Sequence, residues 1–513
     1  MVPEKLPAVP AAIECDPVAT PDLDDFFLEE EVPAKDGKIG KVKTLSTVNI
    51  AHKAIQFFQP VMYANALFVY NTDNGLYGID TGETGCWVQK QLNRMYREHA
   101  KYGLKVGMKC DPVVREVVSQ VKAAKICSIA ASPFDTFNGF PVNNCVLTFD
   151  KDGKIDAVPY TPSMMFTRKS PVNYNPAAST EKAERILKSW IPDVDDDGKE
   201  LWEYLLQIPA QAIYQSLPGM TPFKKAYMLI GEHDSGRSSY NVAIQGFFGK
   251  DNVTTKSLQS FANRFSGGDL EGKYVNFGDD LSTLKIDEGN QFKTLIGLSE
   301  MTVERKFRDT YKARVYATHV YSANSPPEIS SAFFDDEAWW SRWDIVLFNN
   351  HFRRDPSWLA KNIDAEFYEG FMLLVLQEVQ KIIRNEGVLT FSQDWRRVKK
   401  IWTSDLSIFH DFVMLSIDPR QGCHISKECM MEGMVDWALH YLPTPSWMTD
   451  RDEIAQYRKE KRAALPDSFI DLTKALRVEG IEPRQIGDKS WPYWNVTWRD
   501  VAWAKIPELP NDS

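Results

Sequence analysis

A glycine-rich loop between an expected strand and an expected helix has the clearest chemical meaning in this sequence. The apolar residues 227–230 favour a buried strand, and a helical pattern begins after Ser238. Gly231, Gly236, Arg237 and Ser238 have the spacing of a phosphate-binding loop. In such a loop, backbone N–H groups bind phosphate oxygens, a cation meets the terminal phosphates and a hydroxyl binds Mg²⁺. The predicted nucleotide site therefore comprises Gly231, Glu232, His233, Asp234, Ser235, Gly236, Arg237, Ser238 and Ser239.

The cation of this loop is Arg237, whereas lysine is the usual residue at that position. A guanidinium keeps the positive charge but is a planar fork instead of a compact ammonium, so the exchange is not conservative at a fitted phosphate site. The sequence is thus compatible with nucleotide binding combined with slow hydrolysis.

Two carboxylates, Asp279 and Asp280, follow the apolar residues 274–277 about 40 residues after the loop. One carboxylate would hold the hydration shell of Mg²⁺ and the other would orient the attacking water. A solvated turn is the better explanation for an isolated pair of aspartates. Because the glycine-rich loop precedes this pair by about 40 residues, a role in the nucleotide site is the better explanation here.

Residues 292–329 favour two strands joined by a turn, with three cations near its tip: Arg305, Lys306 and Arg308. A cationic hairpin can hold DNA phosphates without reading bases. The alternative is an exposed hairpin with solvated charges. The second strand ends at Asn324, whose amide could reach a γ-phosphate or the lytic water, or could simply form a turn before two prolines. Arg342 precedes another buried-looking strand and could complete the site of a neighbouring subunit.

Composition sets broad limits on the class of protein. The 513 residues require two to four domains, and 43% hydrophobic with 25% charged residues is typical of a globular protein. No apolar stretch of membrane-spanning length and no signal sequence is found, so we expect a soluble, cytoplasmic protein. The seven cysteines are scattered and favour reduced thiols. A metal site at Cys423, His424 and Cys429 is less favoured than incidental placement of these side chains.

The net charge of −10 is concentrated near the N-terminus. Residues 1–40 carry ten acidic and three basic side chains, so the remainder is only −3 and can still present a basic surface to DNA. We expect these first residues to be a disordered acidic tail. Phe26, Phe27 and Leu28 within it could dock on a basic partner, or the tail could act only in solubility.

Periodicity predicts elements on both sides of the loop. Helices are expected at 48–58, 87–103, 180–218 and 364–385, then at 407–417, 425–442 and 465–476, with a strand pair at the end. Residues 66–80 favour two strands joined by an Asn-Gly turn, and residues 137–162 favour short strands. Three helices followed by a turn-linked strand pair suggest a winged helix.

The order of the motifs resembles that of superfamily 3 helicases, and most closely the phage and plasmid primase-helicase family. The resemblance rests on blocks such as RFSGGDLEGKYVNFGDDLS, FKTLIGLSEMTVERKFRD and VYSANSPPEI, together with residues 137–178 upstream. It covers roughly residues 45–500. Two departures are Arg237 and the segment GLSE at 297–300, which replaces a turn richer in glycine and aspartate.

This resemblance implies an α/β fold with an AAA+ P-loop ATPase core, an N-terminal α+β domain with a helical collar, and a C-terminal winged-helix domain. The expected segments are a disordered tail at 1–44, an α+β domain at 45–178 and a helical collar at 179–220. They continue with the core at 221–362, a helical linker at 363–400 and a winged helix at 401–513.

The resemblance also implies a function. The implied function is that of a replicative helicase of a virus, phage or plasmid-like element. Six copies would form a homo-hexameric ring that uses ATP and Mg²⁺ to move along single-stranded or forked DNA. In that ring Asp279 and Asp280 serve metal and water, Asn324 senses the γ-phosphate, and Arg342 acts across the subunit interface. Family members often carry a primase domain in front, which we do not expect here, so a separate primase or polymerase is a possible partner. The alternative is a non-motor replication initiator or maintenance factor with a degenerate loop.

Overall fold

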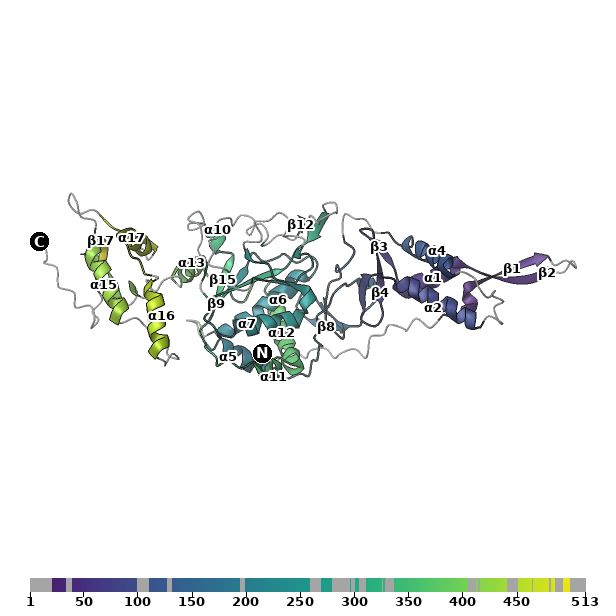
Figure 1. Ribbon diagram of the computed structural model, residues 1–513, viewed down its shortest axis with the longest axis horizontal. Helices are drawn as coiled ribbons and strands as arrows, with labels where there is room; N and C mark the ends of the chain where they lie inside the picture. The colour runs from purple at the N-terminus through teal and green to yellow at the C-terminus, as the bar shows by residue number, and fades with distance from the viewer. Residues whose placement is uncertain are drawn as a thin grey trace.

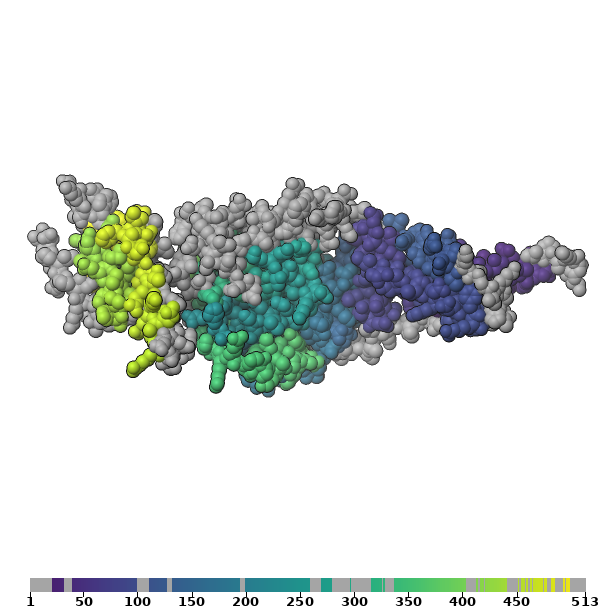
Figure 2. All heavy atoms as spheres, in the orientation of Figure 1, coloured from purple at the N-terminus to yellow at the C-terminus, as the bar shows by residue number. Residues whose placement is uncertain are grey.

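The computed structural model describes residues 21–33, 39–98, 110–126, 132–193, 199–258, 269–278, 296, 300–303, 311–324, 326–327, 336–404, 412–413, 416–440, 451–463, 465–478, 481–484 and 492–498. Three parts follow one another along the long axis of the molecule: an N-terminal unit, a central core and a C-terminal unit (Figure 1). The central core is the bulkiest of them in the space-filling view (Figure 2). The candidate site belongs to this core.

The N-terminal unit packs three helices beside a small antiparallel sheet, and the predicted strand, Asn-Gly turn and strand at 66–80 is confirmed. Its elements are η1 (Leu23–Phe26), β1 (Phe27–Pro33), β2 (Ile39–Leu45), α1 (Thr47–Phe58), β3 (Val61–Tyr63), β4 (Ala66–Asn71), β5 (Leu76–Ile79), α2 (Glu83–Arg97) and α4 (Cys110–Lys122).

The prediction that residues 1–44 form a disordered tail is wrong for residues 22–33 and 39–44. Leu23, Phe26 and Phe27 are buried in one apolar cluster with α1 and α2, and β1 pairs with β2 in an antiparallel ribbon that projects from the unit (Figure 1). The acidic residues between them stay on the surface, where Asp25 forms an ion pair with Lys53 at 2.8 Å. Burial of the apolar side chains therefore outweighs the acidic composition of the segment.

A helical layer packs against one face of the core sheet, in a single apolar cluster with it. The layer consists of α5 (Glu181–Trp190), η3 (Leu201–Glu203), α6 (Tyr204–Ser216) and α12 (Ala365–Arg384), next to the short strands β6 (Phe140–Pro141), β7 (Val146–Phe149) and β8 (Ile155–Val158). The helices predicted at 180–218 and 364–385 are thus confirmed. Two further short turns are η2 (Pro162–Met164) and η4 (Lys250–Asn252).

Helix α6 is buried almost all round, yet one stripe of it is polar. Gln207, Gln211 and Gln215, spaced four residues apart, are each buried and each satisfied. Their side-chain amides donate to the backbone oxygens of Phe391, Lys225 and Tyr316, at 2.9, 3.2 and 2.9 Å. The stripe therefore ties three separate chain segments to one helix.

The core sheet has five parallel strands in the order β10-β11-β14-β9-β15. Their bounds are β9 (Ala226–Gly231), β10 (Val253–Thr254), β11 (Val275–Gly278), β14 (Thr318–Ala323) and β15 (Trp343–Phe348), and α7 (Arg237–Phe248) follows β9. Alternate residues of β9 enter two apolar clusters, one on each face, as a sheet buried on both sides requires. The predicted α/β class is confirmed, and the core sheet is parallel.

Smaller elements surround this sheet. They are the antiparallel pair β12 (Glu300–Val303) and β13 (Tyr311–Arg314), then α10 (Glu337–Trp340), α11 (Trp358–Asn362) and α13 (Trp395–Ser404). The pairing of β12 with β13 agrees with the predicted hairpin, but the prediction that its second strand runs on to Asn324 is wrong. That strand ends at Arg314, and Asn324 follows β14, a separate strand of the core sheet. The tip of the hairpin, with Arg305, Lys306 and Arg308, lies outside the described residues.

The C-terminal unit has an apolar cluster of its own. It contains β16 (Ile417–Ile425), α15 (Lys427–His440), α16 (Arg451–Ala463), α17 (Phe469–Val478) and β17 (Tyr493–Trp498), with β16 and β17 antiparallel. Strand β16 and helix α16 were not predicted, and the winged helix stays a prediction. Within the described residues, no three His, Cys, Asp or Glu side chains lie together as a metal site. None of the described helices combines the length and the apolar composition that a membrane crossing requires.

Candidate functional site

The glycine-rich loop lies at the carboxyl end of the parallel sheet, between β9 and α7. Two glycines allow it to pack closely. A Cβ on Gly231 would lie 2.5 Å from the carbonyl oxygen of Phe348, and one on Gly236 would lie 2.5 Å from Cδ1 of Trp190. Gly236 also has φ of +98°, in the left-handed region that favours glycine. The loop is therefore held against β15 on one side and against α5 on the other.

The guanidinium of Arg237 bridges the loop to the neighbouring strand. Its Nη2 donates to Oδ1 of Asn324 at 2.5 Å and to the backbone oxygen of Glu232 at 3.4 Å, while Nε donates to Oγ of Ser235 at 3.3 Å. Asn324 directly follows β14, which pairs with β9 in parallel. Because parallel strands end at the same edge, two residues 87 positions apart meet here. The structure thus brings together the predicted Arg237 and Asn324.

A cavity of about 620 Å³ opens over the loop, a volume within the range of small-molecule sites. Its lining on the loop side is Glu232, His233, Asp234, Ser235, Gly236, Arg237, Ser238 and Ser239. The opposite lining was not predicted, and it consists of Trp190, Phe352, Arg353, Arg354, Asp355, Pro356, Trp358 and Leu359. The Arg-Arg-Asp-Pro sequence at 353–356, shortly after a buried strand, was the signal that could have revealed it.

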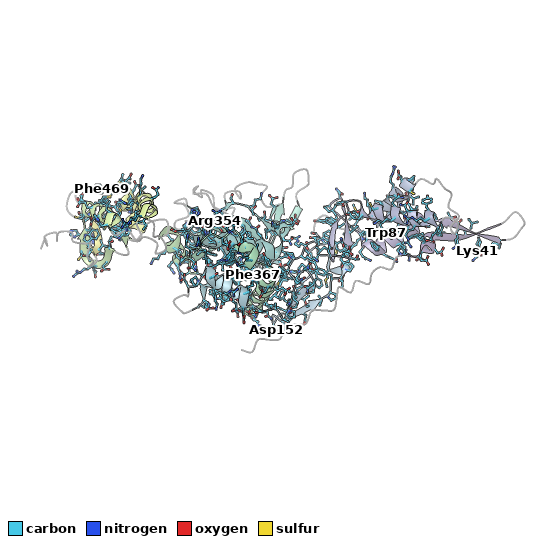
Figure 3. The ribbon with its side chains drawn as sticks, turned by 60° about the horizontal axis from the view of Figure 1, so that its bottom comes forward. Lys41, Trp87, Asp152, Arg354, Phe367 and Phe469 are labelled. Carbon is cyan, nitrogen blue, oxygen red and sulfur yellow. The ribbon has the colours of Figure 1, made fainter. Side chains whose placement is uncertain are left out.

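Hydrogen bonds fix this second wall to the loop. The backbone N–H of Phe352 donates to the oxygen of Asp234 at 2.9 Å, and Nδ1 of His351 lies 3.1 Å from the oxygen of His233. Asn350 donates from Nδ2 to the oxygen of Ser189 on α5, at 2.7 Å. The segment after β15 is therefore part of the same site. Arg354, a residue of this segment, is labelled on the core in Figure 3.

Arg342 lies at the opposite edge of the sheet from the loop. Its backbone oxygen accepts from Ala226, the first residue of β9, while the loop begins at the last residue of that strand. Six residues of strand separate these ends by about 20 Å. The guanidinium donates to the oxygen of Ala338, and burial lowers the pKa of Arg342. Within one chain Arg342 does not reach the glycine-rich loop, so its action on a neighbouring subunit stays a prediction.

Asp279 and Asp280 lie outside the described residues, but the strand before them is described. That strand, β11, ends at Gly278, at the edge where β14 and β9 also end. A Cβ on Gly278 would lie 2.3 Å from Cδ1 of Tyr321, so the close approach of β11 to β14 requires glycine there.

The central strand β14 carries a buried histidine, His319, next to Asn276 and Tyr321. Burial lowers its pKa from 6.5 to about 4. The unfolded chain binds a proton at this residue below pH 6.5, whereas the folded chain does so only near pH 4. Its contribution to stability is therefore complete above pH 6.5 and is lost as the pH falls from 6.5 to 4.

We expect the free energy of unfolding to fall by about 3 kcal/mol across this pH window from His319 alone. The measurement compares urea unfolding of the wild type and His319→Gln at pH 7.5 and pH 4.5. The variant should show the smaller loss on acidification. Equal losses in the two proteins would contradict a neutral buried His319.

Comparisons with known proteins bear on the same segment. The family model of DUF5906, a family of unknown function, matches residues 229–342, from the strand before the glycine-rich loop to Arg342. No curated protein matches the chain. Solved structures that match include the A form apo structure of the NrS-1 C terminal region, at 11% identity and a TM-score of 0.40, covering 85% of this chain and 96% of that one. The apo structure of the NrS-1 C terminal region (305–718) matches at 10% identity with a TM-score of 0.40. The match covers 85% of this chain and 96% of that one.

Proposed function

We propose that this chain binds ATP with Mg²⁺ at the loop Gly231–Ser239 and hydrolyses it to move along single-stranded DNA during replication. The observation that carries the proposal is the meeting of Arg237 and Asn324, at the carboxyl end of a parallel sheet, over a cavity that the glycine-rich loop lines. Ligands of open parallel sheets bind at this edge. The resemblance to superfamily 3 helicases supplies the reaction and the DNA.

Each residue has a distinct role in this proposal. The loop N–H groups and Arg237 bind the phosphates, Ser238 binds Mg²⁺, and Asp279 and Asp280 hold the metal shell and the water. Asn324 contacts the γ-phosphate. In an AAA+ ring of six copies, Arg342 would act on the neighbour's ATP, and Arg305, Lys306 and Arg308 would grip DNA phosphates.

The direct test measures binding of ATP with Mg²⁺ by calorimetry, and phosphate release with and without single-stranded DNA. Wild type should bind ATP and release phosphate faster with DNA. Arg237→Ala should weaken binding roughly 10- to 100-fold, because a charge-assisted contact to phosphate is lost. A matched control is Arg396→Ala, whose side chain is 73% exposed and does not line the cavity. Phosphate release that ignores DNA and survives Arg342→Ala would contradict the motor.

A specific observation favours the second candidate, a nucleotide-binding replication factor that is not a motor. Arg237 already donates to Asn324, so nucleotide must displace this bond before either group meets a phosphate. Arg237→Lys separates the two functions. A motor adapted to arginine keeps or loses its hydrolysis in this variant, whereas a degenerate site gains hydrolysis. Particle images with nucleotide and forked DNA test the six-fold ring.

A further inference from the structure

We infer that the far end of the cavity binds the base of the nucleotide by stacking on Trp358, and that it accepts adenine and guanine alike. This inference rests on the proposed function, because it assigns the part of the same ligand that the phosphate loop does not hold. Its test separates the base from the phosphates.

The sheet order gives the direction of the ligand. Asn324 follows β14, on one side of β9, and β15 lies on the other side. A triphosphate whose terminal group meets Asn324 must extend from the loop away from β14. Its ribose and base therefore lie over the segment that follows β15.

That segment offers an apolar surface to the cavity. Phe352, Trp358 and Leu359 line it together with Trp190 of α5. The rings of Trp190 and Trp358 are 6.0 Å apart with an interplanar angle of 49°, so the buried Trp190 supports the partly exposed Trp358. Leu359 is 36% exposed at the start of α11. An aromatic face beside an exposed leucine suits a flat base.

The polar groups of this wall are poorly suited to read a base edge. The carboxylate of Asp355 already accepts from Ser357, at 2.8 Å from the backbone N and 2.6 Å from Oγ, and these bonds lower its pKa. Arg353 and Arg354 are exposed and have no ion pair with another described residue, which leaves them for the ribose and the α-phosphate. Stacking does not depend on base identity, so we expect purines to bind better than pyrimidines without a preference between them.

The experiment compares the affinities of four probes: the β,γ-imido analogues of ATP and GTP, UTP, and inorganic tripolyphosphate, all with Mg²⁺. Wild type should bind both purine analogues within about 3-fold of each other, and roughly 10-fold more tightly than tripolyphosphate, with UTP between them. Trp358→Ala should weaken the purine analogues about 10-fold and leave tripolyphosphate unchanged, while Trp358→Phe should restore most of the loss.

A second variant guards against misfolding. Leu359→Ser changes an exposed side chain and should weaken the purine analogues by a few-fold, with Leu439→Ser, 46% exposed on α15, as its matched control. Equal weakening of ATP analogue and tripolyphosphate by Trp358→Ala and Leu359→Ser would overturn the stacking site in favour of a structural role. Tripolyphosphate binding as tight as that of ATP would overturn it too, while leaving the phosphate loop intact. Wild type that binds none of the probes would contradict the proposed function itself.

Discussion

Gly236→Val is expected to reduce ATP binding by roughly 100-fold, equivalent to about 3 kcal/mol. A side chain at this position would overlap the indole of Trp190, which lies 2.5 Å from the ideal Cβ, and the residue has φ of +98°. The loop would have to move away from α5, and its N–H groups would no longer converge on the phosphates. Calorimetric titration with ATP and Mg²⁺ measures the effect.

Gly219→Val is the matched control for this experiment. Gly219 also has positive φ, +82°, but an added Cβ meets nothing within 4 Å. Backbone strain alone should therefore cost about 1 kcal/mol of stability without changing ATP affinity. Equal losses of binding in the two variants would show that the contact with Trp190 does not position the loop.

Lys225→Met is expected to lower the free energy of unfolding of the core by about 3–5 kcal/mol. Nζ of Lys225 lies 2.9 Å from Oδ1 of Asp344, whose side chain is fully buried on β15. Burial raises the pKa of Asp344, and the nearby ammonium counteracts that rise. Removal of Lys225 leaves a carboxylate in the core without its counter-charge. Guanidinium unfolding followed by tryptophan fluorescence measures the change.

The double variant Lys225→Met with Asp344→Asn should recover much of this loss, because an amide still accepts from the backbone N of Gln393. Lys361→Met is the exposed counterpart, since Lys361 pairs with Asp355 at 3.7 Å on the surface. It should change stability by less than about 1 kcal/mol. A comparable loss in both lysine variants would contradict the special cost of the buried charge.

Local sequence signals predicted those parts of the site that lie close together in the chain. The strand at 227–230, the loop to Ser239 and the helix after it form one continuous pattern, and Asn324 was found because it ends a predicted strand. The other wall, from Phe352 to Leu359, was missed because it reaches the loop only through the order of strands in the sheet. Spacing along the chain carries no signal for that order.

Composition misled the prediction for the N-terminal segment. Ten acids in forty residues indicated disorder, yet Leu23, Phe26 and Phe27 are spaced so that all three enter the cluster with α1. A few buried aromatic and aliphatic side chains suffice to order such a segment when its charges can remain in water. The net charge of a segment does not show whether its apolar side chains can be buried.

The glutamine stripe of α6 has a mechanical consequence. A slide of this helix by two residues, about 3 Å, would break its amide bonds to Phe391, Lys225 and Tyr316 at once and leave them unsatisfied in the interior. These bonds thus fix the position of α6 along its axis relative to β9, β14 and the segment after α12. A displacement of β14 would therefore carry α6 with it.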